Sequence, residues 1–227
     1  MKYDAVIFDL FGTLIDNYPW AESNNILRQM ASELSVPPDD FVALWHAAFD
    51  ERMKGIFRSY QACIGHICQQ LAVHVQDNQI ELAASIRSDM TKLMVTAPRE
   101  GAVEVLSYLK SNGYKTGLIS NCSVETTMVW QETPLAPLID VAVFSCLEGA
   151  MKPDPRIYQI AVEKLAVKPE ECLYVGDGME QELASASKLG MHAFMIRVPN
   201  ESDWDPYREE WNGPVISSLK EVLNLVR

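Results

Sequence analysis

The sequence predicts an α/β fold in which a doubly wound parallel sheet carries an inserted all-helical region. Short apolar runs of strand length occur near the N-terminus and throughout the second half of the chain. Segments with helical periodicity separate these runs, and such alternation is typical of parallel sheets. The segment 17–96, in contrast, contains helical patterns and no convincing strand.

The predicted strands are continuous apolar runs rather than alternating ones. The first, Ala5–Phe8, ends at Asp9. Runs without polar interruption are expected of strands that are buried on both faces of a parallel sheet. Four similar runs follow: Thr116–Ile119, Val141–Phe144, Cys172–Val175 and Ala193–Ile196.

Three amphipathic helices are predicted between these strands. Their apolar stripes are Val103, Leu106 and Leu109; Ile157, Ile160, Ala161 and Leu165; and Leu183, Ala186 and Leu189. Gly113 and Gly190 are expected to end the first and third helices, and Pro155 is favoured in the first turn of the second.

The segment 17–96 is predicted to form a separate helical domain. Four apolar stripes begin near Ile26, Phe41, Ile64 and Leu82, and Pro37-Pro38 ends the first of them. The expected division is therefore a core of residues 1–16 and 97–227, with the helical domain at 17–96.

Composition and charge narrow the classes of function. The 227 residues are 48% hydrophobic and 22% charged, with a formal net charge of −12 at pH 7. Such an acidic chain is a poor nucleic-acid binder, and an anionic small-molecule substrate would need local positive groups. We expect no membrane span, no secretory signal and a cytoplasmic location with free cysteines. No pattern specifies an oligomeric state.

Chemically useful side chains follow four of the predicted strands. Ligands of open α/β sheets bind beyond the carboxyl ends of the strands. The residues found there are Asp9 and Gly12 after the first strand, Ser120 and Asn121 after the second, Lys152 after the third, and Asp177 with Glu182 after the fourth.

These residues suit metal-assisted covalent hydrolysis. Asp9 and Asp177 can share Mg²⁺, which prefers carboxylate and water oxygens. A carboxylate can attack phosphorus or carbon, while Ser120 and Lys152 bind the oxygens of the transferring group. Each feature alone also has an ordinary explanation as a turn, a helix cap or a solvated lysine. Their occurrence after four successive strands favours a shared site.

At these positions the sequence resembles the haloacid dehalogenase superfamily. The matching stretches are Phe8 to Leu14, Ile119 to Asn121, Met151 to Pro155, and Val175 to Gly178 with Glu182. The resemblance implies a Rossmann-like core, a helical cap at 17–96, aspartate-based covalent catalysis and, usually, hydrolysis of small phosphorylated metabolites with Mg²⁺.

The resemblance also implies a role for each residue. Asp9 is the expected nucleophile and a metal ligand, and Asp177 is the acidic ligand of the fourth motif. The Phe11 backbone carbonyl is a further metal ligand, and Glu182 binds the metal through water. The expected phosphoryl-binding residues are Ser120 and Lys152, and Gly12 and Asn121 complete the substrate-binding set. Asp16 is a hinge candidate or, equally, a capping residue.

Phe11 departs from the phosphatase pattern. Phosphatases of this superfamily usually carry a second aspartate at that position as general acid and base, whereas its 2-haloacid dehalogenases carry an aromatic residue and need no metal. The leading hypothesis is a Mg²⁺-dependent phosphatase. The alternatives are a metal-independent dehalogenase and a catalytically weakened binding protein. Candidate substitutes for the missing acid are Cys122, Glu180, His46 and His66, each of which also has an ordinary structural explanation.

Overall fold

The computed structural model describes residues 2–17, 19–199 and 208–226. Within these ranges the chain forms one all-parallel sheet of six strands in the order β3-β2-β1-β4-β5-β6. The strands are β1 (Ala5–Phe8), β2 (Lys115–Ser120), β3 (Val141–Phe144), β4 (Cys172–Gly176), β5 (His192–Ile196) and β6 (Val215–Ile216). The predicted fold class is confirmed. Only β6 was missed, because two residues are too few to give a pattern.

The central strand β1 explains why the apolar runs are continuous. It pairs with β2 on one side and β4 on the other, so that Phe8 lies opposite Leu118 and Val175. All four of its residues are buried. Side chains alternate between the two faces of the sheet along this strand. Val6 and Phe8 pack into one apolar cluster, and Ala5 and Ile7 pack into another.

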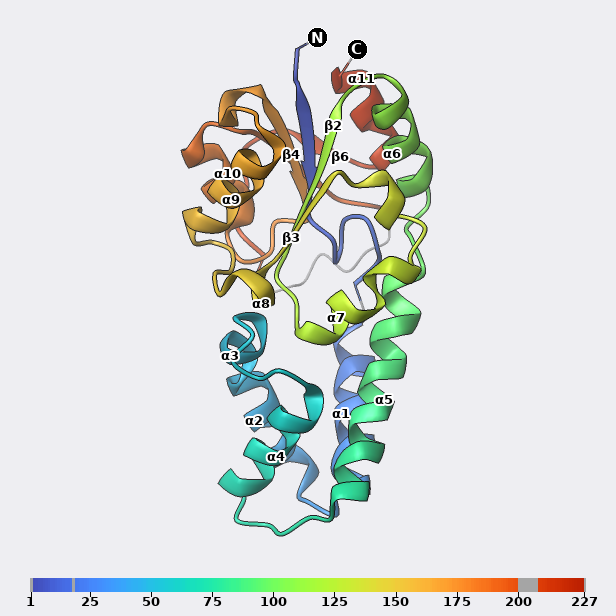
Figure 1. Cartoon of the computed structure of the whole chain (residues 1–227), viewed down its shortest axis with the longest axis vertical. Coiled ribbons are helices and arrows are strands. Elements are labelled where there is room, and N and C mark those ends of the chain that lie inside the picture. The colour runs from blue at the N-terminus through green and yellow to red at the C-terminus, as the bar shows by residue number, and fades with distance from the viewer. Residues whose placement is uncertain (1, 18, 200–207, 227) are drawn as a thin grey trace.

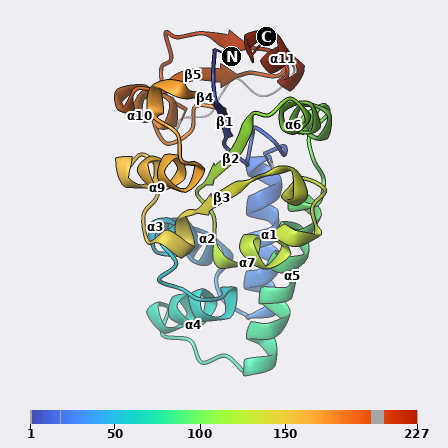
Figure 2. The same cartoon turned by 45° about the horizontal axis from the view of Figure 1, so that its top comes forward.

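Helices cover both faces of the sheet (Figures 1 and 2). One face packs against α6 (Ala102–Ser111) and α11 (Val222–Val226), and the other against α9 (Pro155–Leu165) and α10 (Glu182–Leu189). The stripe of α6 differs from the prediction by one residue, because Val105 is buried whereas Val103 is 39% exposed.

Shorter elements lie in the connections that follow or precede the strands. They are α7 (Val124–Val129), α8 (Ser145–Glu148) and the 3₁₀ turns η1 (Trp130–Glu132), η2 (Ala136–Leu138), η3 (Pro169–Glu171) and η4 (Leu219–Glu221).

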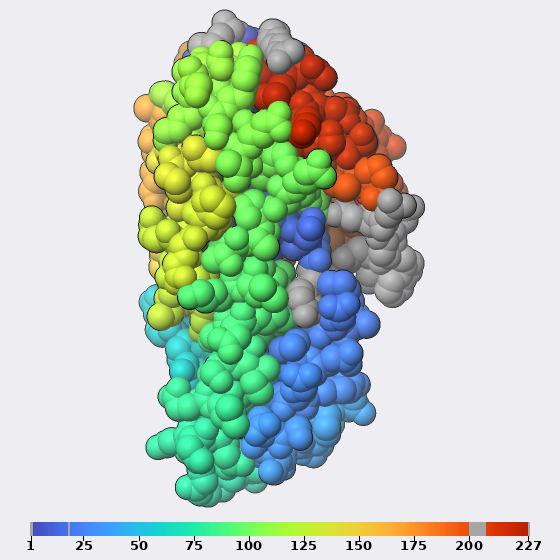
Figure 3. All heavy atoms as spheres, turned by 90° about the vertical axis from the view of Figure 1, so that its right-hand side faces the viewer, coloured from blue at the N-terminus to red at the C-terminus, as the bar shows by residue number. Residues whose placement is uncertain are grey.

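Five helices between β1 and α6 form what we call the helical unit. They are α1 (Trp20–Glu33), α2 (Pro38–Ala47), α3 (Phe49–Met53), α4 (Tyr60–Gln70) and α5 (Asp77–Val95). The unit has its own apolar core, and α1 and α5 lie side by side (Figure 3). The stripe that begins near Phe41 forms α2, and the chain continues into the separate helix α3 after Ala48. Among the described helices, none combines the length and apolarity needed to cross a bilayer.

Two chain segments connect the helical unit to the sheet. Ile15 and Pro98 form an isolated antiparallel bridge, and the Arg99 amide donates to the Leu14 carbonyl at 2.8 Å. Arg99 Nε also donates to Asp16 Oδ1 at 2.7 Å. Asp16 therefore ties the outgoing segment to the returning one, and its role as a hinge or a capping residue remains a prediction.

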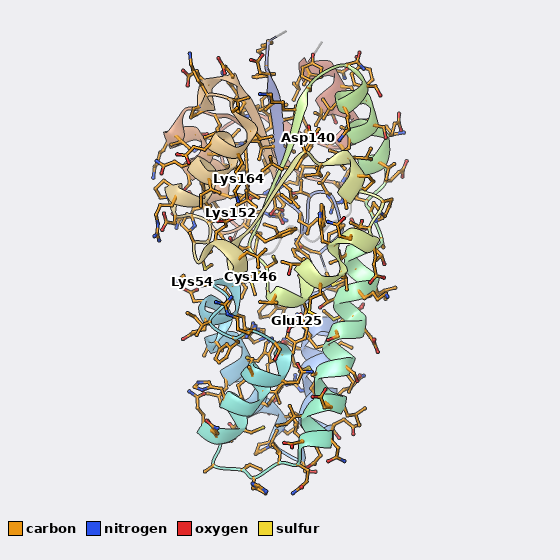
Figure 4. The ribbon with its side chains drawn as sticks, viewed as in Figure 1. Lys54, Glu125, Asp140, Cys146, Lys152 and Lys164 are labelled. Atoms are coloured by element: carbon orange, nitrogen blue, oxygen red, sulfur yellow. The ribbon has the colours of Figure 1, made fainter. Side chains whose placement is uncertain are left out.

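A third connection runs from α3 to the loop of α8, near Cys146 and Lys54 in Figure 4. The buried hydroxyl of Ser145 donates to the Met53 carbonyl at 2.6 Å and accepts from the Cys122 amide at 3.0 Å. One side chain thus joins the helical unit to the loop that follows β2.

We predict that Ser145→Ala lowers the free energy of unfolding by about 1–3 kcal/mol, because the buried Cys122 amide and Met53 carbonyl lose their partner. Urea denaturation measures the loss. Ser111→Ala is the matched control, since that exposed hydroxyl bonds only within its own helix, and it should change stability by less than about 0.5 kcal/mol. Equal values for the two variants would contradict the role of Ser145.

Candidate active site

The predicted site residues converge at the end of the sheet that faces the helical unit (Figure 1). The chain runs outward from β1 in both directions, so the sheet reverses its order between β1 and β4, where α/β proteins bind ligands. A cavity of about 870 Å³ opens there between the sheet and the helical unit. Asp9, Phe11, Asn121, Lys152 and Asp177 line it.

Lys152 is the central cation of the site. Its side chain is only 3% exposed, and Nζ lies 2.5 Å from Asp9 Oδ1 and 2.6 Å from Glu182 Oε2. Figure 4 shows Lys152 in the sheet domain, above the junction with the helical unit. Burial alone would lower the pKa of Lys152, but Asp9 and Glu182 hold it well above its ordinary value. Lys152 is therefore a permanent positive charge beside Asp9.

Three buried carboxylates surround this lysine. Oxygens of Asp9, Asp177 and Glu182 lie within 4.8 Å of one another. If all are ionised, one ammonium leaves two negative charges uncompensated in a buried space, which is unfavourable. Asp9 Oδ2 is buried and has no hydrogen-bond partner in the part of the chain that the structure describes. A hard divalent cation fits this set of oxygens and restores neutrality.

The pKa shifts follow from the same crowding. Burial raises the pKa of Asp9 to about 6, although the charge of Lys152 opposes it. Burial, and then the charges of Glu182 and Asp9, raise the pKa of Asp177 well above its usual range. Both shifts express the cost of holding anions together away from water.

Glu182 is tied to the protein at both oxygens. Tyr174 donates to Oε2 at 2.7 Å, and the Gly178 amide donates to Oε1 at 3.0 Å. Because these hydrogen bonds fix Glu182, its ion pair with Lys152 fixes the position of the ammonium group. Its role as a metal ligand through water remains a prediction.

Asn121 and Gly12 shape the site through backbone contacts. The Asn121 side chain accepts from the Lys152 amide at 2.8 Å and donates to the Lys152 carbonyl at 3.0 Å, which fixes the lysine loop. Gly12 has φ +79°, and a Cβ there would lie 2.1 Å from Asp177 Oδ2. Gly12 thus permits the close approach of the first and fourth motifs.

Ser120 and Phe11 occupy different surroundings. Ser120 is fully buried at the end of β2, and its hydroxyl has no hydrogen-bond partner among the described residues. It is absent from the cavity lining, as are Gly12 and Glu182. Phe11 lines the cavity and packs against the apolar cluster of β1. Phosphoryl binding by Ser120 and metal binding by the Phe11 carbonyl remain predictions.

Three of the suggested substitutes for the missing acid reach the cavity. Cys122, Glu180 and His46 line it, whereas His66 instead packs against Phe57. Asn121 donates to Glu180, and burial raises the pKa of Glu180 to about 7 despite the nearby charge of Lys152.

Sequence patterns missed two arginines at this cavity. Arg87 comes from α5 and Arg208 from the segment after β5. Nε and Nη1 of Arg208 are buried without hydrogen-bond partners in the described ranges. Neither arginine belongs to a motif, and only the fold brings them to the cavity.

Comparisons with known proteins place these observations in a family. A profile of haloacid dehalogenase-like hydrolases matches residues 3–190. Glyceraldehyde 3-phosphate phosphatase of Pyrococcus furiosus is 26% identical, with 99% of this chain and 93% of that protein aligned. (S)-2-haloacid dehalogenase 4A of Burkholderia cepacia is 27% identical over 98% of this chain and 94% of that protein. The structure of a HAD phosphatase from Thermococcus onnurineus has a TM-score of 0.69 at 20% identity, covering 98% of this chain and 97% of that one.

We predict that Gly12→Ala lowers hydrolytic turnover about 100-fold or more, because the new methyl group displaces Asp177 and small displacements in active sites have effects of this size. Gly113→Ala is the control: Gly113 has φ +80°, but a Cβ there meets nothing within 4 Å. Both variants carry the cost of a left-handed alanine, about 1–2 kcal/mol. Thermal denaturation should therefore show a similar loss of stability in both variants, whereas turnover should fall only in Gly12→Ala. Equal turnover in the two variants would refute the displacement of Asp177.

Proposed function

The chain belongs to the haloacid dehalogenase-like hydrolases, and we propose that within this family it is a Mg²⁺-dependent phosphatase of small, anionic phosphate monoesters. We further propose that residues 17–96, which contain the helical unit, act as a cap over a core of residues 1–16 and 97–227. The phosphatase similarity over nearly the whole chain and the buried carboxylate group support this assignment.

The two oxygens of Asp9 carry the proposal, because they have different surroundings. Oδ1 is held by Lys152, whereas Oδ2 has no partner in the described structure and is available to react. In the first step Oδ2 attacks phosphorus and the bond to the ester oxygen breaks, so that the alcohol leaves with its electron pair and takes up a proton. Water then attacks the phosphorus of the phosphoaspartate, which releases inorganic phosphate and restores Asp9.

Residues of this chain suit Mg²⁺ as the resident cation. Asp9 and Asp177 would bind it directly, with the Phe11 carbonyl as a further ligand and Glu182 acting through water. When bound, the cation offsets the repulsion between the carboxylates and an anionic phosphoryl group. Lys152 and Ser120 would bind the phosphoryl oxygens, and Gly12 and Asn121 would keep the surrounding loops in place.

Phe11 supports a second candidate, a metal-independent 2-haloacid dehalogenase. Here Asp9 attacks the carbon that bears the halogen, the carbon–halogen bond breaks, and halide leaves without a proton. Water then hydrolyses the resulting ester. An apolar side chain at position 11 is no hindrance to this reaction, and dehalogenases occur among the similar proteins. The three buried carboxylates, which are costly to hold together without a cation, favour the phosphatase.

Chelation distinguishes the two reactions. We predict phosphate release from phosphate esters that stops in EDTA and returns with Mg²⁺. Halide release from 2-haloacids that survives EDTA would indicate the dehalogenase instead, and no product from either panel would indicate a binding protein.

Asp9→Asn should lower turnover to background in either enzymatic reaction, because the amide is a poor nucleophile. Asp40→Asn, which changes an exposed carboxylate in α2, should leave turnover unchanged. Product release measured side by side in the two purified variants checks this. Near-normal activity in a folded Asp9→Asn variant would refute the covalent mechanism.

Phe11→Asp is predicted to raise hydrolysis of alkyl phosphates, since general acid catalysis contributes about 10²- to 10⁴-fold. Hydrolysis of 4-nitrophenyl phosphate should rise much less, because nitrophenolate leaves without protonation. The ratio of kcat/KM for the two ester classes measures the effect. An unchanged ratio in a folded variant would mean that another group already supplies the proton.

A further inference from the structure

A smaller recess of about 160 Å³ extends from the site into the helical unit. It shares all but two of its lining residues, Trp45 and Arg52, with the large cavity. Asp9 and Lys152 do not line it, so the recess lies away from the reacting groups. At roughly 30 Å³ per water molecule, it has room for about five water-sized groups.

Two arginines contribute positive charge to this recess. The Arg52 side chain is 6% exposed, and its guanidinium carbon lies 4.3 Å from the centre of the Trp45 ring. The guanidinium carbon of Arg87 lies 5.7 Å from the same ring. Arg52 donates to the Trp45 carbonyl, and Arg87 Nη1 lies 3.4 Å from the Ser23 hydroxyl.

Neither arginine has an anionic partner among the side chains that the structure describes. No described carboxylate forms an ion pair with Arg52 or Arg87, and Arg87 Nε is buried without a hydrogen-bond partner in that same part of the chain. Burial lowers the pKa of His46, and the charges of Arg52 and Arg87 lower it further. Two positive charges therefore face this recess, and no described carboxylate is in direct contact with either guanidinium group.

A buried charge without a partner of opposite charge is unfavourable. The chain contains more acidic than basic residues, yet none of the described acidic residues forms an ion pair with these arginines. Stacking on Trp45 satisfies the faces of the guanidinium groups but leaves N–H donors at their edges. Planar guanidinium groups match the paired oxygens of carboxylates and phosphates. Arg87 also lines the large cavity, so one side chain connects the recess to the space beside Asp9.

We propose that this recess binds a second anionic group of the substrate, a carboxylate or phosphate at the end remote from the phosphoryl group that Asp9 attacks. The inference rests on the phosphatase function proposed above and narrows the substrate class to phosphate monoesters with an anionic tail. Arg87 is the specificity-determining residue, and Arg52 reinforces its charge.

The test uses matched esters of increasing length. ω-Phosphooxy carboxylates, ω-phosphooxy alcohols and α,ω-bisphosphates are compared by kcat/KM with Mg²⁺. At the length that spans the two sites, the wild-type protein should prefer an anionic tail by about 10- to 100-fold, as expected for one charge-assisted hydrogen bond. The carboxylate and bisphosphate series determine which anion is bound. Equal kcat/KM for anionic and hydroxyl tails at every length would overturn the inference.

Variants of Arg87 test whether the recess causes the preference for anionic tails. Arg87→Gln should reduce the ratio of kcat/KM between anionic and hydroxyl tails toward one, and Arg87→Lys should retain part of it. Arg28→Gln, which changes an exposed arginine of α1, should retain the full ratio. A full ratio in folded Arg87→Gln would overturn the assignment. If Arg87→Gln does not fold, the Arg87→Lys ratio decides, because an unaltered preference there would count against a guanidinium-specific contact.

Binding distinguishes failure of this inference from failure of the proposed function. Phosphonoalkanoates and alkylphosphonates of equal length are titrated by calorimetry in the presence of Mg²⁺. Arg87-dependent preference for the phosphonoalkanoate without any ester hydrolysis would support the recess and refute the phosphatase. Ester hydrolysis without a preference for anionic tails would support the phosphatase and refute the recess.

Discussion

The ion pairs of one buried ammonium group organise the site. Lys152 contacts Asp9 from the first strand end and Glu182 from the start of α10, so that it joins three distant parts of the chain. This convergence depends on the parallel sheet, because only parallel strands bring all their carboxyl ends to one edge. The continuous apolar runs that build the sheet are therefore also what positions the charges. Burial makes the arrangement strict, since a displaced Lys152 would leave Asp9 and Glu182 without their shared cationic partner.

The same charges explain why the site suits a cation and a phosphoryl group. Lys152 compensates only part of the negative charge of Asp9, Asp177 and Glu182, and the excess raises the pKa of the two aspartates. Asp9 and Asp177 would hold a divalent cation, and its charge would offset this repulsion. With the carboxylates neutralised, the arginines that line the cavity, Arg87 and Arg208, would favour an anionic substrate despite the overall charge of −12.

Residues that follow the strands could be predicted from the sequence, whereas Arg87 of α5 could not. Asp9, Asn121 and Asp177 each follow an apolar run, so the topology fixes their place once the strands are recognised. Arg87 lies on α5, and the apolar pattern of that helix predicts only which of its faces is buried. The pattern does not predict which cavity the polar side chains at the edge of that face line. The binding of Lys152 by Glu182 was also missed, because a spacing in sequence shows proximity to a site but not the partner of a side chain.

The recess in the helical unit also bears on the chemistry at Phe11. Without an acid at position 11, an alkoxide leaving group is not protonated from there, and the reaction is slower. Binding of a remote part of the substrate can offset this loss of rate, because it positions the ester for attack. A 2-haloacid carries its carboxylate on the carbon that loses the halide, so the same molecule has no remote anion to place near Arg87. Asp9 does not line the recess, and an anion bound there must belong to a longer substrate. Arg52 and Arg87, which form no ion pair with a described carboxylate, thus favour a phosphate ester with an anionic tail over a 2-haloacid under the proposal made above.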